Sequence, residues 1–379
     1  MELTDIRRRI DEVDDEILAL FLQRMDLSEA VAAYKKEHGL PILNRTRERE
    51  ILARLAEKAG ARERYVYPLY STLFELARTR QQELMDSPTH VGGQIRAALA
   101  REEAVFPSAG SVACQGVEGA YSQAACDRLL PRGRIVYVRS FEAVFDAVES
   151  DLCRFGVLPI ENSSYGSVRA VYDLLQRKHF SIVRSTRLCI RHQLLARPGT
   201  ALSDITEIYS HQQAIGQCAR FLASLPHVRV IPCGNTAAAA QLVGAPDGPL
   251  HAAAIASPAC AELYGLVPVA DNMQDSDNNY TRFICITRDP VIYAGSGRIS
   301  LILSCDNKPG ALYEILSRLA ALGINMTKLE SCPVTGRNFE FIFFLELEAS
   351  VRTPGVLPML EEMERTCQGF QFLGCYAEV

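Results

Sequence analysis

The first 86 residues carry an apolar stripe with helical spacing. Apolar residues recur there at alternating steps of three and four, which predicts one long amphipathic helix. The stripe consists of Leu3, Ile6, Ile10, Val13, Ile17, Leu20, Leu27, Val31 and Tyr34. Gly39-Leu40-Pro41 is expected to end this helix, Asn44 to cap a second through about Glu57, and a third to run from about Tyr65 to Met85. Two shorter helices do not cover so long a stripe, so we expect a dimer of an all-α domain, residues 1–87.

A turn-rich linker over residues 88–109 separates this domain from a different pattern, in which short apolar runs alternate with amphipathic segments. Such alternation is typical of α/β domains. The strand-like runs cover residues 112–114, 135–138, 156–160, 188–195, 208–209, 228–231, 253–255 and 282–286. Helices are expected to begin at Tyr121, Phe141, Val168, Gln213, Thr236 and Pro258. We therefore predict an α/β domain over residues 110–290.

Residues 297–379 follow a third pattern: strand, helix, strand, strand, helix, strand. The expected strands are residues 299–303, 326–330, 339–347 and 370–376, with helices starting near Pro309 and Val356. This βαββαβ order is typical of an α+β ferredoxin-like unit. Three domains fit a chain of 379 residues.

Composition narrows the range of functions. The net charge is −5, and the 22% of charged residues are mixed in sign, without a basic stripe, so we expect no nucleic-acid partner. No apolar run is long enough for a membrane span, and the first residues lack a signal-peptide pattern. The 12 cysteines stand singly, with no C-x-x-C pair and no metal-like spacing. We expect free thiols in the cytoplasm, no membrane partner and no metal site.

Arg24 breaks the apolar stripe of the first helix. A charge in such a position is costly unless it is paired. Lys35 follows eleven residues later on nearly the same face, roughly 16 Å along the axis. Arg47 and Glu48 stand in the first turn of the second helix, and Gln81 lies on the inward side of the third. Two interpretations remain: an internal ion pair such as Arg24 with Glu48, or a buried cationic pocket for a small dianion.

These residues resemble the all-helical chorismate mutases. The resemblance implies that seven residues bind chorismate: Arg7, Arg24, Lys35, Asn44, Arg47, Glu48 and Gln81. Arg24, Lys35 and Gln81 would also be catalytic, since the unimolecular rearrangement to prephenate needs only clamped carboxylates and donors to the breaking ether bond. Arg7 points roughly 100° away from Arg24, so it would reach the partner's pocket. Asn44 and Ala77 depart from the family's usual aspartate and serine.

A polar cluster follows the strand-like run that ends at Glu161-Asn162. The residues Ser163-Ser164-Tyr165-Gly166-Ser167 lead into a helical pattern that starts at Val168. This is either an ordinary strand-to-helix turn with Ser167 as N-cap or a site for a small anion at the helix start. Similar polar turns stand at residues 116–122, 210–213, 235–236 and 257–258, which indicates a cleft suited to a dicarboxylate.

The polar loop 274–280 runs directly into Thr281-Arg282-Phe283. Together with Ile160-Glu161-Asn162-Ser163 and Ser210-His211, it resembles the prephenate dehydratases from about Cys114 to Ile286. The resemblance implies a fold of two lobes like that of periplasmic binding proteins, about 110–187 plus 271–290 and about 188–270. It also implies that Thr281 is catalytic, with Asn162, Ser210, Gln217, Glu161 and Arg282 around the substrate.

The reaction itself suggests what Thr281 does. Prephenate loses carbon dioxide and a ring hydroxyl, and hydroxide is a poor leaving group, so a donor must lie on that oxygen. A threonine is too weak an acid to supply the proton alone, and Glu161, His211 and water are the alternatives for a relay. Strand alternation puts Thr281 and Phe283 on one face and Arg282 on the other, so Arg282 is expected to support the site from behind.

The last domain resembles the amino-acid-binding regulatory domain known as ACT. Gly310-Ala311-Leu312 and Glu330-Ser331-Cys332-Pro333 match the two motifs that bind phenylalanine in dehydratases, and Asn325 is a further expected contact. The family usually has arginine where Cys332 stands. The alternative is that this domain serves only for dimerisation and binds no amino acid.

In this order the three domains resemble the bifunctional chorismate mutase/prephenate dehydratases with an ACT domain. The resemblance implies chorismate and prephenate as substrates, phenylalanine as a feedback inhibitor, a homodimer or larger homo-oligomer, and no cofactor. Two rivals are an arogenate dehydratase, against which the fused mutase and the lack of a transit peptide argue, and a sensor of two lobes whose catalysis has lapsed.

Overall fold

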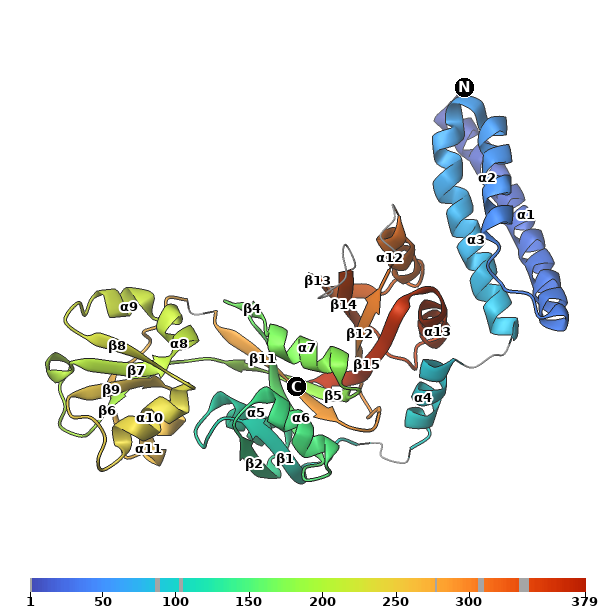
Figure 1. The fold of residues 1–379 in the computed structure, drawn as a ribbon. Helices are drawn as coiled ribbons and strands as arrows, with labels where there is room; N and C mark the ends of the chain where they lie inside the picture. The colour runs from blue at the N-terminus through green and yellow to red at the C-terminus, as the bar shows by residue number, and fades with distance from the viewer. Residues whose placement is uncertain (1, 86–88, 102–104, 277, 306–309, 334–340) are drawn as a thin grey trace. The chain divides into compact units, whose positions relative to one another are not determined.

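The computed structural model describes residues 2–85, 89–101, 105–276, 278–305, 310–333 and 341–379 (Figure 1). The chain forms two compact units. One comprises Met1–Arg96 and Ile302–Gln371, and the other comprises Ala97–Leu301 and Phe372–Val379. No described helix has the length and apolar character to span a membrane.

The helical segment confirms the three predicted helices. They are α1 (Leu3–His38), α2 (Arg45–Ala59) and α3 (Glu63–Met85), with the 3-10 turn η1 (Gly60–Arg62) before α3 and α4 (His90–Leu99) after it. Gly39 ends α1 in the left-handed region, with φ 63°, and its N–H binds the Lys35 carbonyl. Asn44 begins α2, because its side chain accepts a hydrogen bond of 3.0 Å from the Arg47 N–H.

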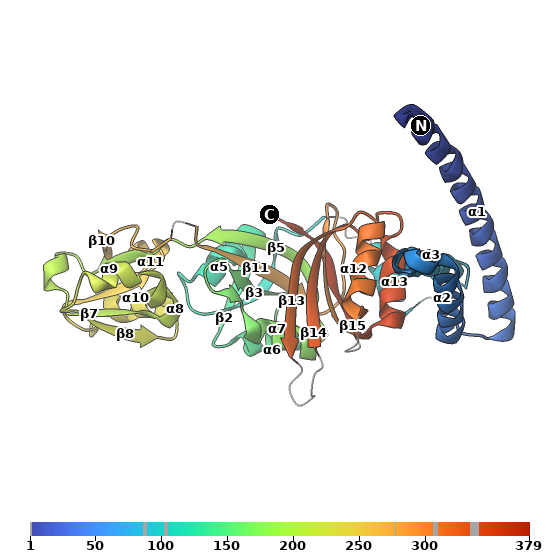
Figure 2. The same ribbon diagram turned by 90° about the horizontal axis from the view of Figure 1, so that it is seen from above.

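The apolar stripe of α1 is largely uncovered in a single chain. Helix α3 packs against both α1 and α2, and Figure 2 shows the N-terminal half of α1 projecting beyond them. Ile10 is 52% exposed and Ile17 58%. Exposure of so many aligned apolar side chains is typical of an interaction surface.

The second unit contains two sheets. One has the order β15-β5-β11-β3-β1-β2, with β4 paired to β3, and the other has the order β10-β6-β9-β7-β8. The strands of the first are β1 (Ala109–Gln115), β2 (Arg132–Val138), β3 (Phe155–Asn162), β4 (Gly166–Ser167), β5 (Ser181–Cys189), β11 (Tyr280–Thr287) and β15 (Gln368–Glu378). Those of the second are β6 (Gln193–Ala196), β7 (Glu207–His211), β8 (Arg229–Cys233), β9 (Ala252–Ala256) and β10 (Val267–Ala270).

Short helices connect these strands. They are α5 (Tyr121–Leu129), α6 (Phe141–Glu149), α7 (Arg169–Arg177), η2 (Leu202–Asp204), α8 (Gln212–Gln217), α9 (Ala219–Ala223), α10 (Thr236–Gly244) and α11 (Ala259–Leu263). Strands β1, β2 and β3 are parallel, whereas β11 runs antiparallel to both β3 and β5. The chain therefore passes from one lobe to the other after β5 and returns before β11 (Figure 1).

Each lobe has its own core. Fully buried Val112, Phe155 and Val157 belong to the first core, and burial of one such side chain stabilises the fold by about 1.5–3 kcal/mol. In the second lobe the residues Ala252–Ala256 of β9 pack against the alanine-rich α10. Small side chains on both elements let the helix approach the sheet closely.

Two local predictions in this domain are wrong. Residues 188–195 do not form one strand: β5 ends at Cys189, and β6 begins at Gln193 in the other sheet. The break lies where the Ile190 N–H donates to the Asn279 carbonyl at 2.7 Å instead of continuing a ladder. Ser167 is not an N-cap either. It belongs to β4 and pairs with Glu161 of β3, and Val168 occupies the cap position of α7.

The remaining elements confirm the βαββαβ order. They are β12 (Arg298–Ser304), α12 (Ala311–Ala321), β13 (Asn325–Pro333), β14 (Phe341–Glu348), α13 (Val356–Thr366) and β15. Their strand order is β13-β14-β12-β15. Gly310 takes the cap position of α12 with φ 86°, a conformation that favours glycine. Pro309, expected at the helix start, and residues 339–340, expected in a strand, lie outside the described residues.

Candidate active sites

Asn162 and Thr281 face each other across β3 and β11. The antiparallel register pairs these two residues directly, and Asn162 Nδ2 donates to Thr281 Oγ1 at 2.9 Å. Asn162 Oδ1 accepts from the main-chain N–H groups of Ser164 and Tyr165, at 3.0 and 3.1 Å. The polar turn after β3 thus holds the Asn162 side chain in place, and these two N–H groups are engaged by it rather than open to an anion.

Arg282 and Glu161 lie on the opposite face of the same two strands. They too are a register pair, and their side chains form an ion pair of 3.0 Å, with Arg282 only 5% exposed. Because adjacent strand residues point to opposite faces, this pair lies behind Thr281 and Asn162. Both residues are therefore placed to support the site from its back.

Asn279 joins the two lobes at this point, and sequence reasoning did not select it. Its Oδ1 accepts from Asn162 Nδ2 at 2.9 Å and from Gln217 Nε2 at 3.3 Å. Gln217 belongs to α8 of the second lobe, whereas Asn162 belongs to β3 of the first. Asn279 is 2% exposed. The only available signal was its position two residues before Thr281, in the loop already singled out.

His192 extends this hydrogen-bonded group and was also missed. Its Nε2 lies 2.9 Å from Gln217 Oε1. Burial lowers the pKa of His192, an effect that the hydrogen bond to Gln217 opposes. A neutral ring donates from Nε2 to Gln217 and leaves Nδ1 toward the Tyr121 hydroxyl, 3.5 Å away. Thr281, Asn162, Asn279, Gln217 and His192 thus form one continuous network.

Ser210 stands apart from this network among the described contacts. It is fully buried, and its hydroxyl donates to the Ile255 carbonyl of neighbouring β9 at 2.7 Å. His211 caps α8, accepting from the Gln213 N–H at 3.4 Å, and burial lowers its pKa. Together they fix the start of the helix that carries Gln217.

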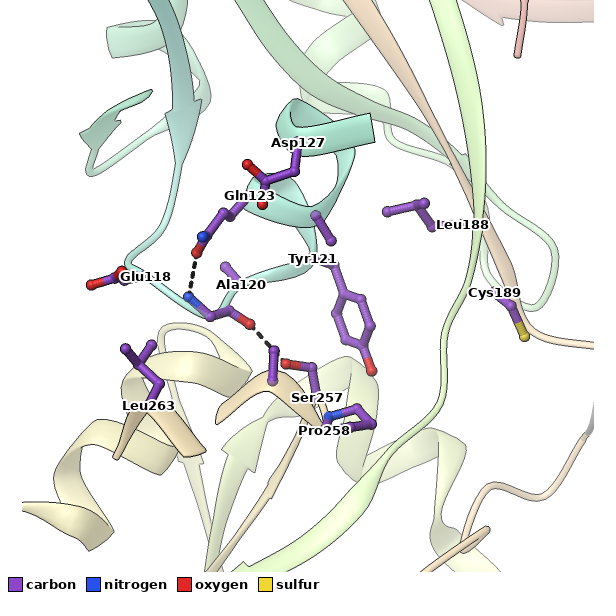
Figure 3. A pocket seen from close by; sticks show the side chains of 13 residues that line it. Glu118, Ala120, Tyr121, Gln123, Asp127, Leu188, Cys189, Ser257, Pro258 and Leu263 are labelled. Atoms are coloured by element: carbon purple, nitrogen blue, oxygen red, sulfur yellow. Dashed lines mark hydrogen bonds between the residues drawn. The ribbon is translucent and has the colours of Figure 1, made fainter. Parts of the chain in front are cut away.

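A cleft of about 340 Å³ opens between the lobes, within the range typical of small-molecule sites. Its lining includes Tyr121 but not Thr281 or Asn162. Figure 3 shows Tyr121 projecting from the start of α5 toward Ser257 and Pro258 on the other lobe. Ser257 donates to the Gly119 carbonyl at 2.8 Å, which ties the two walls together. Leu188 lines the cleft and is the β5 partner of Thr281, so the cleft borders the strand that carries Thr281.

The helical segment brings Lys35 and Gln81 into contact. Lys35 Nζ donates to Gln81 Oε1 at 3.1 Å and to the Ile42 carbonyl at 2.5 Å. Burial lowers the pKa of Lys35, and the negative charge of Glu48 raises it in part. Arg24 donates to the Leu73 carbonyl at 3.0 Å.

The proposed ion pair between Arg24 and Glu48 is wrong. Glu48 instead accepts a hydrogen bond of 2.6 Å from Arg78, while the Arg24 guanidinium lies 5.5 Å from the centre of the Phe74 ring. The Arg47 guanidinium pairs with Glu50 on the surface, and its side chain is 63% exposed. Arg7 lies on the exposed part of α1.

Three family models match the chain in succession: chorismate mutase type II over residues 6–82, prephenate dehydratase over 112–291 and the ACT domain over 299–364. The bifunctional chorismate mutase/prephenate dehydratase of Escherichia coli K12 is 30% identical over 383 aligned residues, covering 99% of this chain and 96% of that protein. The chain belongs to the bifunctional chorismate mutase/prephenate dehydratase family. It is an enzyme with an isomerase domain and a lyase domain.

Two further relatives match the dehydratase and ACT part of this family member. The chloroplastic arogenate dehydratase/prephenate dehydratase 2 of Arabidopsis thaliana is 37% identical, covering 70% of this chain and 72% of the plant protein. The solved structure of prephenate dehydratase from Arthrobacter aurescens, in complex with L-Phe, superposes with a TM-score of 0.64 at 28% identity. It covers 70% of this chain and 89% of that one.

The expected effector residues of the bifunctional enzyme lie at the start of α12 and at both ends of β13. Gly310, Ala311 and Leu312 stand at the start of α12, and Glu330 and Ser331 near the end of β13. Asn325 begins β13 and donates to Glu348 at 3.0 Å. Asn325 and Ser331 are six positions apart on β13, so their Cα atoms are separated by roughly 20 Å. One chain therefore does not bring Asn325 and Ser331 to the same phenylalanine.

No group of three or more metal-ligating side chains occurs among the residues that the structure describes. All twelve cysteines are described, and none of them forms a disulfide bond.

Proposed function

We propose that the helical domain rearranges chorismate to prephenate and that the two-lobed domain converts prephenate to phenylpyruvate, with phenylalanine as feedback inhibitor. The observation that carries this proposal is the contact between Asn162 and Thr281, two residues more than a hundred positions apart, at the border of an inter-lobe cleft. The family membership supports both activities.

In the mutase step the protein stabilises the charges that develop on the rearranging substrate and forms no covalent bond with it. The Lys35 ammonium has three protons, of which two are directed at Gln81 and Ile42. The third is available to the ether oxygen of chorismate, where negative charge grows as the bond breaks. Gln81 uses its oxygen toward Lys35, so its Nε2 is the donor available to the same ether. Arg24 supplies a positive charge for a carboxylate.

In the dehydratase step Thr281 is the donor to the departing hydroxyl. Its Oγ1 accepts from Asn162, so the threonine proton is directed elsewhere, and the substrate hydroxyl is its partner. Arg282 holds Glu161 on the other face, which argues against Glu161 as a direct proton relay and leaves His211 and water as the alternatives. Loss of carbon dioxide is favoured where a pocket shields the substrate carboxylate from water.

Feedback inhibition requires phenylalanine to bind a less active arrangement of the protein more tightly. The ACT match and the L-Phe complex of the Arthrobacter aurescens enzyme support phenylalanine as the ligand. The exposed stripe of α1 supports a homodimer in which Arg7 enters the partner's mutase pocket. Twelve cysteines without a disulfide bond support a cytoplasmic location.

Arogenate is the second candidate substrate for the two-lobed domain. The 37% identity to a plant arogenate dehydratase/prephenate dehydratase favours it, whereas the fused mutase, whose product is prephenate, favours prephenate. Turnover of the two acids at equal concentrations decides between them.

The test supplies chorismate alone and follows prephenate and phenylpyruvate, with and without phenylalanine. In Thr281→Val the dehydratase kcat should fall about 10²–10³-fold, as for other lost transition-state donors, and prephenate should accumulate. The control is Thr287→Val at the far end of the same strand. Full phenylpyruvate production by Thr281→Val would overturn the proposed role of Thr281.

A further inference from the structure

The carboxylate of Glu378, near the end of β15, lies close to three arginines: Arg187 and Arg282 of the dehydratase domain and Arg298 at the start of β12. The carboxylate lies 3.0 Å from Arg187, 3.7 Å from Arg298 and 3.9 Å from Arg282. The Glu378 side chain is 23% exposed and the Arg282 side chain 5%. All four residues belong to the second unit. No motif in the sequence marks Glu378.

The main chain around Glu378 is fixed to the dehydratase sheet. Strand β15 pairs in parallel with β5, with Ala377 opposite Arg184 and Glu378 opposite Ser185. The Val379 N–H donates to the Ser185 carbonyl at 2.9 Å, and the Thr186 hydroxyl donates to the Val379 main-chain oxygen at 2.7 Å. The two hydrogen bonds of Val379 and the strand pairing at Ala377 and Glu378 thus fix the main chain from which the Glu378 carboxylate projects.

Arg282 connects Glu378 to the catalytic strand. It is the neighbour of Thr281 on β11, and its other carboxylate partner, Glu161, is the neighbour of Asn162 on β3. The pair Thr281–Asn162 and the pair Arg282–Glu161 occupy consecutive steps of the ladder, one on each face of the sheet. A β-bulge follows immediately, between Arg282 and Phe283, so the ladder alone does not fix this step from that side.

We propose that Glu378 is a positioning residue of the dehydratase centre, which holds Arg282 and through it keeps Thr281 in register with Asn162. A buried guanidinium is costly without charged partners, so the position of its side chain follows the positions of those partners. With Glu378 and Glu161 on it, Arg282 is held between β15 and β3. This proposal rests on the proposed role of Thr281 and Asn162. It means that the last strand of the βαββαβ unit supplies a side chain to dehydratase catalysis.

The test compares Glu378→Gln with Glu207→Gln in the full-length protein. Glu207 is a matched control, because its side chain is 24% exposed and pairs with Arg229 in the other lobe. Glu378→Gln should lower the dehydratase kcat about three- to tenfold with KM for prephenate nearly unchanged, since a small misplacement of a reacting group affects turnover first. Glu378→Asp, which keeps the charge, should recover part of the loss. Mutase activity should stay within error of wild type.

Wild-type kcat in Glu378→Gln would overturn the proposal, as would an equal loss in Glu207→Gln or a loss confined to KM. A further comparison separates this outcome from failure of the proposed function. If Thr281→Val is inactive while Glu378→Gln is not impaired, only the role of Glu378 is wrong. If Thr281→Val keeps full activity, the catalytic assignment itself is wrong.

Discussion

The candidate residues of the mutase and dehydratase regions differ in how they are distributed along the chain and in how far the chain buries them. The mutase residues come from three helices within 85 residues of chain, and the helix that carries Arg24 and Lys35 also exposes Ile10 and Ile17 by more than half. The dehydratase residues come from segments far apart in the chain, yet Asn162, Asn279 and His192 are each at most 4% exposed. The apolar stripe on the mutase helix is uncovered in a single chain, whereas these dehydratase residues are buried by their own chain.

This difference indicates which changes would lower each activity. In the proposed dimer the helical site depends on association, because the uncovered stripe and Arg7 would act only together with a partner subunit. A site built from a hydrogen-bonded network depends on every member of that network, since a buried polar group that loses its partner is costly.

The largest effect is expected from Lys35→Met, which keeps the length of the side chain and removes its charge. The mutase kcat should fall about 10³-fold, because the donor to the ether oxygen is lost. Dehydratase activity on supplied prephenate should not change. Lys36→Met is the control, since Lys36 is exposed and donates only to the Leu84 carbonyl among the described contacts. Loss of both activities in Lys35→Met would show that the two regions are not independent.

Next in size is the double change Ile10→Glu with Ile17→Glu on the exposed stripe. If a partner covers this stripe and contributes Arg7, the mutase kcat/KM should fall about 10²-fold, and sedimentation velocity should show weaker association. Glu12→Lys, on the other side of α1, should alter neither. A double variant that sediments and rearranges chorismate like wild type would contradict the proposed dimer.

A smaller effect is expected in the closed site from Asn279→Ala, which removes the oxygen shared by Asn162 and Gln217. The dehydratase kcat should fall about tenfold, because both donors lose their common acceptor and the two lobes lose a link. Asn278→Ala is the matched control, since the adjacent side chain is exposed. Equal activity of the two variants would show that Asn279 does not organise the site.

The smallest effect is a displacement of the pH profile of the mutase. Burial lowers the pKa of Lys35 from 10.5, and the ammonium is the active form. Activity should therefore be complete below that pKa and fall as pH rises through it, with the alkaline limb of kcat/KM below pH 10.5. Lys35→Arg should move the limb upward, whereas Glu48→Gln should move it downward by removing the charge that raises the pKa. A limb unaffected by either change would assign it to another group.

Stability should respond to Lys35 in the opposite direction. The folded state favours the neutral amine relative to the unfolded state, so the unfolded state binds more protons between the folded pKa and 10.5. The free energy of unfolding contributed by this group therefore rises with pH in that window. Denaturant titrations of wild type and Lys35→Met across the window measure the difference.

Sequence reasoning located the elements better than the contacts between them. The three helices of the first segment followed from spacing and from caps at Asn44 and Gly39, which act within a few residues. Strand β5 was largely missed because Ser185 and Thr186, both fully buried, break its apolar pattern. The sequence showed no reason for the strand to leave one sheet and enter another after Cys189.

The candidate site shows the same limit at the level of single residues. Alternation along β11 was enough to predict that Arg282 lies behind Thr281, because the side-chain period of a strand is local. The partners of Arg282 are residues 161 and 378, and no local rule connects them. Likewise Asn279 stood in the selected loop, but its importance comes from Gln217 on a different lobe.

The sequence by itself determined most of the helices and strands, the order of the three domains and the residue types able to bind a doubly negative acid. These features depend on spacing, on caps and on backbone conformation over short stretches of chain. Only the tertiary structure decided that Glu48 pairs with Arg78, that Asn279 bridges two lobes and that Glu378 reaches the strand of Thr281. Such pairings join residues distant in the chain, and their energies depend on which surfaces fold together.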